Sequence, residues 1–463
     1  MKLKFALNAV MLLLAFSAIA TAQNCRCESC ENPYGQQTLE QRRFWQDVRD
    51  NIASSQGPTN AGPSNFGFAQ MVFLDFDSGD DGDVDYTRSI RDAIQAEMEN
   101  IYQGFNVVFS QTNPGGLFST IVFNSGGAGG GIAEDIDFRN VNPSDNAVLN
   151  ASGIGLTSDE DITAVSSLIA AHELGHLLGL RHHDMFGPIG NGVPPGFGPF
   201  YTPVYTGPTD SFEQEDHVMI TGAFGIPFAA FFGPNWFSER SSVKLTIATG
   251  FQTTADAANN DSIATAQAVE LTNMTAPNTI VDGQNTSDFD FSASALVVEG
   301  SLDGTADPRD VFQIEARAGD LFNMAVLSTV PDRLAINPID PNISVFDSTG
   351  AFVDYFGSDA FNENELKSLD SIVTDLVIPA DGTYFIQVDS PDVNDSGVYE
   401  LLVYRFNGLQ GDVNCDGNVD LLDVAPFVDA ITSGDSLPKA DMNNDGFVNL
   451  LDVQPFVALL NNG

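Results

Sequence analysis

The chain has 463 residues, of which 43% are hydrophobic and 17% charged, so it carries enough apolar material for folded cores and is not a disordered protein. Its length predicts two to four domains. A net charge of −45, from 63 acidic against 18 basic residues, repels phosphate backbones and anionic lipid, which excludes nucleic acid as an expected partner and favours cation binding, Ca²⁺ above all.

The first 22 residues have the pattern of a secretory signal peptide. Lys2 and Lys4 precede an apolar run over 5–20, and Ala20 and Ala22 place small residues before the cleavage point. The run is short for a membrane span, so an uncleaved anchor is the weaker alternative. Since no later stretch is long and apolar enough to cross a bilayer, we expect a secreted or cell-surface protein without a transmembrane anchor.

Residues 23–63 are polar, and we interpret them as a pro-segment or linker. Cys25, Cys27 and Cys30 cluster here, whereas the fourth cysteine, Cys415, lies far along the chain. Two interpretations stay open: a local disulfide with a leftover thiol, and a latency switch in which a thiolate of this segment occupies the open position of a metal site.

Residues 64–250 alternate strand-like and helix-like patterns, which predicts an α/β domain. We expect strands at 68–75, 107–109 and 120–123, a glycine-rich turn at 125–131, an edge strand at 131–138, helices at 87–102, 159–180 and 238–248, and a long insertion at 186–212. Six carboxylates between 75 and 85 form either a Ca²⁺ loop or a solvated acidic turn.

Three of the five histidines lie in the segment His172-Glu-Leu-Gly-His176-Leu-Leu-Gly179-Leu-Arg-His182. On a helix, His172 and His176 lie one turn apart on one face, so both imidazoles can reach one Zn²⁺. Glu173 then lies beside the metal, where it can take a proton from a water molecule. Gly179 allows a sharp turn with positive φ that brings His182 back as third ligand and leaves a fourth position open.

This segment resembles the zinc signature of the metzincin clan of metalloendopeptidases at every motif position, and the resemblance covers roughly 64–250. It implies that His172, His176 and His182 are zinc ligands and that Glu173 is the general base. It also implies a methionine turn beneath the site. Met219 is the candidate for that turn, and Met185, which follows the third histidine closely, is its rival. A structural histidine cluster and a degenerate site are the alternatives.

Residues 255–407 change to short alternating strands separated by turns, which predicts an all-β sandwich. The expected strands span 311–314, 321–327, 343–346, 371–378, 384–388 and 399–404. On the segments 311–314 and 382–388, this region resembles the bacterial pre-peptidase C-terminal domain found beside secreted proteases.

Residues 409–463 contain an internal duplication in which two twelve-residue loops have EF-hand spacing. The expected Ca²⁺ ligands are Asp412, Asn414, Asp416, Asp420 and Asp423 in the first copy, and Asp441, Asn443, Asp445, Asn449 and Asp452 in the second. The pair resembles a type I dockerin module, which implies a cohesin-like receptor. Leu421-Leu422 and Leu450-Leu451 replace the polar residues usual in dockerins, so a different receptor, or packing onto the chain's own sandwich, stays open.

The expected fold class is therefore multidomain: an α/β metzincin-like catalytic domain, an all-β sandwich and a small α-helical, EF-hand-like dockerin module. The expected function is a secreted Zn²⁺-dependent endopeptidase that cleaves internal bonds of protein or peptide substrates, with Ca²⁺ as a second cofactor. The alternative is a catalytically inactive, surface- or scaffold-attached binding protein assembled through its Ca²⁺-dependent tail. An intact Glu173 favours the enzyme, because divergence would usually remove the base first.

Overall fold

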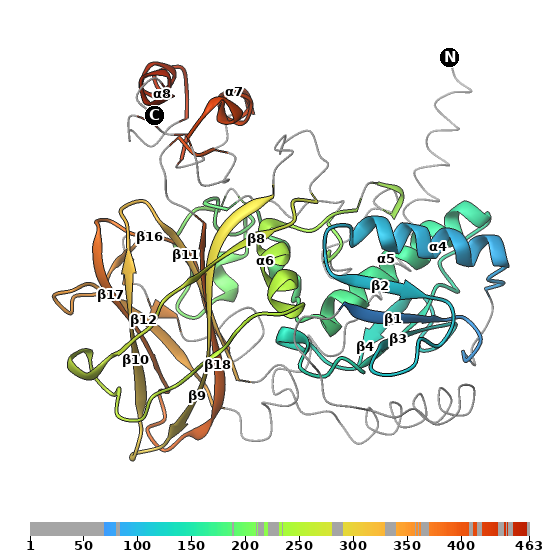
Figure 1. The fold of residues 1–463 in the computed structure, drawn as a ribbon, viewed down its shortest axis with the longest axis horizontal. Coiled ribbons are helices and arrows are strands. Elements are labelled where there is room, and N and C mark those ends of the chain that lie inside the picture. Colours follow the sequence, from blue (N-terminus) through green and yellow to red (C-terminus); the bar gives the residue numbers. More distant parts are fainter. Residues whose placement is uncertain are drawn as a thin grey trace.

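The computed structural model describes most of the chain beyond residue 68 and shows an α/β unit beside a β-sandwich, with a helical tail (Figure 1). The described residues are 69–79, 84–187, 189–209, 211, 217–220, 231–233, 235–279, 290–328, 339–356, 358–359, 361–362, 370–406, 411–413, 419–433, 439–440, 442 and 448–460. The predicted signal peptide, the pro-segment with its three cysteines, and Cys415 lie outside these residues.

The α/β unit is built on a five-stranded sheet of order β2-β1-β3-β5-β4, in which every pair is parallel except the antiparallel pair of β4 with β5. Its strands are β1 (Gln70–Asp75), β2 (Val107–Ser110), β3 (Ser119–Phe123), β4 (Gly130–Ala133) and β5 (Asn146–Asn150). Strand β4 therefore lies at one edge of the sheet. The helices α4 (Arg88–Ile101) and α5 (Asp159–Leu177) pack together, and α5 also contacts β4 and β5.

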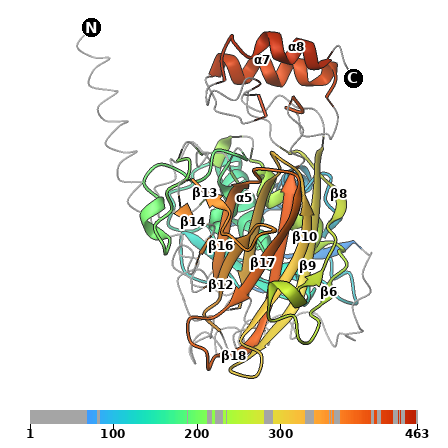
Figure 2. The same cartoon turned by 90° about the vertical axis from the view of Figure 1, so that its left-hand side faces the viewer.

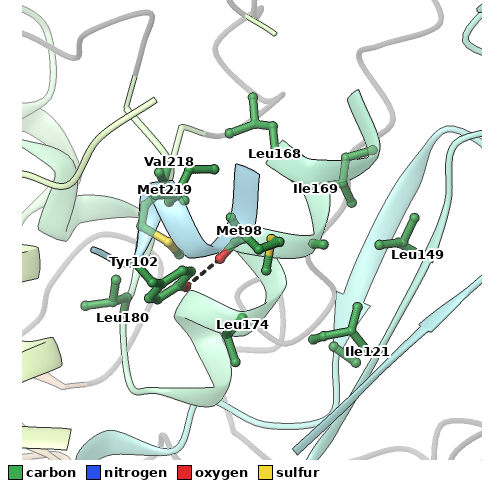
Figure 3. Packing of buried hydrophobic residues seen from close by; sticks show 14 of the residues in the cluster. Met98, Tyr102, Ile121, Leu149, Leu168, Ile169, Leu174, Leu180, Val218 and Met219 are labelled. Carbon is green, nitrogen blue, oxygen red and sulfur yellow. Dashed lines mark hydrogen bonds between the residues drawn. The ribbon is translucent and has the colours of Figure 1, made fainter. Parts of the chain in front are cut away.

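The two helices form where the apolar spacing predicts them. Helix α4 buries Ile90, Ile94 and Met98 along one face. Helix α5 starts with a capping box in which the Ser158 hydroxyl accepts from the Asp161 backbone N–H at 3.0 Å. The Tyr102 hydroxyl, at the end of α4, donates to the Ala171 carbonyl of α5 at 2.8 Å, which fixes one helix against the other (Figure 3).

The sandwich consists of two facing sheets, of order β15-β12-β17-β10-β7 and β16-β11-β18-β9-β6, with β8 added on β9 and a separate β13-β14 pair. The strands are β6 (Thr254–Ala255), β7 (Gln267–Ala268), β8 (Thr272–Ala276), β9 (Phe291–Asp303), β10 (Arg309–Ala316), β11 (Leu321–Leu327), β12 (Asn342–Phe346), β13 (Asp354–Tyr355), β14 (Ser358–Asp359), β15 (Phe361–Asn362), β16 (Ser371–Val377), β17 (Gly382–Asp389) and β18 (Ser396–Phe406). The expected alternation holds in the second half of β10, where Phe312 and Ile314 are buried, Gln313 is half-buried and Glu315 is exposed.

Several expected boundaries were wrong. Helix α5 ends at Leu177 rather than at 180, because Gly179 adopts φ +89° and ends the helix. The expected edge strand at 131–138 is only β4, since the chain continues into a 3₁₀ turn, η1 (Phe138–Asn140). Since β4 begins at Gly130, the glycine-rich turn ends before this residue rather than at 131. Strands β5 to β9 and β13 to β15 were not predicted.

Helix α6 (Glu239–Ala248) joins the two units, and Figure 1 shows it between the sheet of the α/β unit and the sandwich. Its Val243 and Ile247 belong to one buried cluster with Ala293 and Ala295 of β9. Helix α6 also contacts the neighbouring strand β8, and the buried Phe291 and Val297 of β9 belong to the same cluster. The two units thus share a buried surface.

Three buried arginines of the α/β unit form ion pairs with the sandwich at the surface that the two units share. Arg139 pairs with Glu400, Arg181 with Asp370, and Arg240 with Asp375, where the N–O distance is 2.8 Å. All six side chains are at most 7% exposed. A buried pair that loses one partner leaves an uncompensated charge, so these contacts disfavour separation of the two units.

The tail contains α7 (Val424–Ser433) and α8 (Val453–Leu460), which Figure 2 shows as neighbouring helices apart from the sandwich. The Phe427 and Phe456 rings, one from each repeat, stack with centroids 4.0 Å apart and form the centre of a small core. Among the described helices, none combines the length and apolar character that crossing a membrane requires.

The shared surface predicts the effect of Ile247→Ala. Ile247 is 1% exposed, so truncation leaves a cavity between α6 and the sandwich, and we expect a loss of about 2–5 kcal/mol in the free energy of unfolding, measured by denaturant titration. Val108→Ala, at a position 44% exposed on β2, is the control and should change stability by less than about 0.5 kcal/mol. Equal effects of the two substitutions would contradict a shared core.

Candidate metal centre

Three imidazoles converge at the end of α5. His172 and His176 lie one turn apart on the helix, and their Nε2 atoms are 3.2 Å apart. His182, the first residue of a 3₁₀ turn, η2 (His182–Met185), places its Nε2 atom 3.1 Å from that of His172. Tetrahedral coordination by Zn²⁺ at about 2.0–2.1 Å would separate ligand nitrogens by about 3.3 Å, so the spacing fits a zinc site.

Backbone carbonyls determine which nitrogens face one another. The Nδ1 atom of His172 lies 2.9 Å from the Val218 carbonyl oxygen, and that of His176 lies 2.7 Å from the Leu180 carbonyl oxygen. A carbonyl only accepts, so both Nδ1 atoms carry the proton and both Nε2 atoms of the neutral rings expose lone pairs. Two lone pairs 3.2 Å apart repel unless a cation lies between them. The donor set therefore fits a divalent metal that accepts imidazole.

The turn after α5 depends on Gly179. The N–H of Gly179 donates to the His176 carbonyl at 2.8 Å, and the N–H of Leu180 donates to the Gly175 carbonyl at 2.9 Å. The expected positive φ is confirmed, at +89°. A Cβ atom here would also lie 2.6 Å from the Cα atom of Phe138, so only glycine fits at this position.

Glu173 lies beside the imidazoles and next to the edge strand β4. It is 4% exposed, and a Cβ atom on Gly131 would lie 2.7 Å from its Oε1 atom. The backbone of β4 thus passes directly against this carboxylate. Glu173 is not one of the three residues whose ligand atoms cluster.

Met219 is fully buried beneath the site. Its side chain packs on Gly175, between the two helical histidines, where an added Cβ atom would lie 2.4 Å from the Met219 Sδ atom. Figure 3 shows Met219 and Val218 side by side among the buried residues. The Val218 carbonyl orients His172, so this short turn both supports the helix and fixes one ring. The rival Met185 is also buried, within η2.

His217 lies in the same turn and is completely buried. Burial lowers the pKa of its imidazole to about 3, so the ring is neutral near pH 7. It packs against the Trp236 ring at a centroid distance of 5.2 Å rather than toward the three converging nitrogens.

A second cluster, in the sandwich, was not predicted. Asp256, Asp307 and Asp310 bring one carboxylate oxygen each within 4.8 Å of one another. The Tyr399 hydroxyl donates to Oδ2 of Asp310 at 2.6 Å, whereas Oδ1 of Asp310 is buried and has no hydrogen-bond partner in the described part of the chain. The Asn260 amide donates to Asp256 at 2.9 Å. No local motif joins these residues, because they come from segments about fifty positions apart.

The charge of this cluster is unfavourable without a cation. Burial and neighbouring carboxylates raise the pKa of Asp310 to about 8 and that of Asp307 to about 6. Oxygen ligands of this kind suit a hard cation such as Ca²⁺, which would stabilise the charged carboxylates.

The two tail loops have matching local structure. The Asp420 carboxylate accepts from the Leu422 N–H at 2.7 Å, and the equivalent Asn449 side chain accepts from the Leu451 N–H at 2.8 Å. Asp412, Asp423 and Asp452 are buried, as expected for ligands that point into a loop. The other expected ligands, Asn414, Asp416, Asp441, Asn443 and Asp445, lie outside the described residues.

The unusual tail leucines are exposed. Leu421 and Leu422 are 79% and 45% exposed, and Leu450 and Leu451 are 77% and 66% exposed. Packing of these side chains onto the chain's own sandwich is therefore wrong for this structure, and they form an apolar surface open to a partner.

Residues 410–460 match the model of the dockerin type I domain, so the tail is a dockerin, a module that binds Ca²⁺. The pre-peptidase C-terminal domain of the collagenase from Bacillus anthracis is similar at 16% identity, over 33% of this chain and 98% of that one, with a TM-score of 0.18. PliG, a periplasmic inhibitor of g-type lysozyme from Aeromonas hydrophila, is similar at 17% identity, over 30% of this chain and 97% of that one, also with a TM-score of 0.18. No curated protein matches the chain.

The sandwich cluster predicts Ca²⁺ binding outside the tail. In a chain that ends at residue 406, millimolar Ca²⁺ should raise the thermal unfolding temperature, because the cation offsets the repulsion among the three carboxylates. Asp310→Asn should remove most of that shift, whereas Asp354→Asn, at an exposed site on the same sandwich, should keep it. An unchanged unfolding temperature on adding Ca²⁺ to the parent chain would exclude this cation site.

Proposed function

We propose that this chain is a secreted Zn²⁺-dependent endopeptidase that a dockerin tail attaches to a surface or scaffold. The main support for this proposal is that the Nε2 atoms of His172, His176 and His182 converge. Backbone carbonyls hold the rings of His172 and His176 in the tautomer that ligates metal. The matched signature and the buried acid at Glu173 support hydrolysis rather than a structural metal site.

Three protein ligands would leave a coordination position for chemistry. When bound, Zn²⁺ would act as a Lewis acid that polarises a substrate carbonyl and lowers the pKa of a water molecule. Glu173 would take the proton of the attacking water and deliver it to the leaving amine. No serine or cysteine nucleophile is needed, so serine-protease reagents should leave activity intact.

The edge strand supports an extended peptide as the substrate. Strand β4 pairs only with β5 among the described strands, so its other edge can accept a peptide in an extended conformation. Gly131 of β4 touches Glu173, so a peptide on this edge would lie beside the proposed base. Such a geometry holds the middle of a chain, which favours cleavage of internal bonds.

The dockerin match supports a cohesin-type protein as the partner of the tail. The exposed leucine pairs would give this partner a largely apolar contact, in contrast to the polar positions usual in dockerins. Attachment through the tail and secretion through the N-terminal segment would place the peptidase outside the cell, where its acidic surface and Ca²⁺ sites suit the environment.

Glu173→Gln tests the mechanism. The amide cannot accept the proton of water, so peptide cleavage should fall by roughly 10²–10⁴-fold while one equivalent of zinc is retained. Glu160→Gln, in the exposed first turn of the same helix, is the control and should cleave like the parent. The measurements are zinc content by elemental analysis and cleavage of a peptide library. If the parent binds zinc but cleaves no peptide, the result would support an inactive binding protein instead.

The leucine pairs test the partner. Leu421→Ser combined with Leu450→Ser should weaken Ca²⁺-dependent binding to an immobilised type I cohesin at least tenfold, because both side chains are largely exposed in the free tail and would lose apolar contact area. Val393→Ser, at an exposed site on the sandwich, should bind like the parent. If the parent shows no binding to the cohesin, the partner is a different receptor.

A further inference from the structure

One tripeptide, residues 180–182, contributes to two of the three imidazole positions. The Leu180 carbonyl accepts from the Nδ1 atom of His176 at 2.7 Å, and His182 itself supplies the third ring. Arg181 lies between them and is 4% exposed. Whatever fixes Arg181 therefore fixes the orientation of one imidazole and the position of another.

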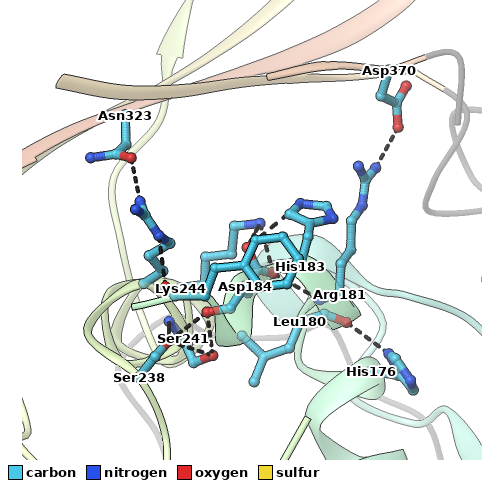
Figure 4. Close-up of polar contacts among 12 residues, drawn as sticks. His176, Leu180, Arg181, His183, Asp184, Ser238, Ser241, Lys244, Asn323 and Asp370 are labelled. Atoms are coloured by element: carbon cyan, nitrogen blue, oxygen red, sulfur yellow. Dashed lines mark hydrogen bonds and ion pairs between the residues drawn. The ribbon is translucent and has the colours of Figure 1, made fainter. Parts of the chain in front are cut away.

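Arg181 is fixed from two directions, as Figure 4 shows. Its backbone N–H donates to Oδ2 of Asp184 at 2.8 Å, and the ammonium of Lys244, on α6, holds that carboxylate at 2.7 Å. Its guanidinium donates to Asp370 of the sandwich. The carboxylate of Asp370 is completely buried, and its other oxygen accepts from the Ser328 N–H at 2.7 Å.

We propose that Asp370 of the sandwich is a positioning residue for the metal centre and that it acts through Arg181. The inference rests on the proposed zinc site. The sandwich is then a structural part of the metal centre rather than a separate accessory module. Without the carboxylate, the buried Arg181 guanidinium has lost its ion-pair partner, and relief of that charge requires residues 180–182 to move. Groups that orient metal ligands typically contribute 10–100-fold to metal affinity.

The chain contains a matched control for this contact. Arg240 and Asp375 also form a buried pair across the two units, at 2.8 Å, and the Asp375 carboxylate is completely buried too. The second partner of Asp375 is the N–H of Gly192, at 2.9 Å, in the long insertion. This pair thus fixes α6 and the insertion to the sandwich but holds neither Leu180 nor His182.

The experiment compares Asp370→Asn with Asp375→Asn in the full mature chain. Both variants should lose similar thermal stability in the metal-free form, because each replaces the buried carboxylate that forms an ion pair with a buried arginine. Competition with a chromophoric zinc chelator should show a 10–100-fold weaker zinc affinity for Asp370→Asn and less than a threefold change for Asp375→Asn. The readout is metal affinity and needs no substrate.

A conservative pair covers the case in which Asp370→Asn does not fold. Arg181→Lys keeps the charge but loses the planar fork, so its zinc affinity should fall at least threefold, whereas Arg240→Lys should match the parent. Equal zinc affinities within each pair of variants, in a parent that binds zinc, would overturn the positioning role alone. A parent that binds no zinc would overturn the proposed function as well.

Discussion

The structure depends on a pair of hydrogen bonds from imidazole N–H groups to backbone carbonyls. The Val218 and Leu180 carbonyls hold the Nδ1 atoms of His172 and His176, so the Nε2 lone pairs of both rings point at one place, 3.2 Å apart. That arrangement is unfavourable without a cation, since two like partial charges face each other. The surrounding chain must therefore be rigid enough to impose it.

Rigidity comes from elements on every side of the helix that carries the first two rings. Met219 packs under Gly175, Gly179 turns tightly against Phe138, and the Tyr102 hydroxyl bonds to the helix backbone. Two of these contacts need glycine, because any side chain would collide with its neighbour. The two glycines therefore let Met219 and Phe138 pack closely against the helix end, which holds the imidazole rings in place.

The sandwich belongs to this support as much as the α/β unit does. Arginines from the α/β unit reach buried carboxylates of the sandwich, and helix α6 shares a buried cluster with β9. In a chain with so few basic residues, three arginines placed at one internal surface neutralise acids that could not otherwise be buried. Asp256, Asp307 and Asp310 instead gather in a cluster that suits Ca²⁺.

The sequence alone determined what is local: helix spacing places His172 beside His176, and loop spacing marks the two tail repeats, because both follow from neighbours along the chain. It also predicted the main strands of both units from alternation, but not β5 and β9, nor the short strands β6, β7, β8, β13, β14 and β15, whose pairing depends on distant segments. Only the tertiary structure decided that Asp256 and Asp310 meet, that Asp370 reaches Arg181, and that the tail leucines are exposed. Those contacts join residues far apart in sequence, and the packing of whole elements, rather than any local pattern, brings their side chains together.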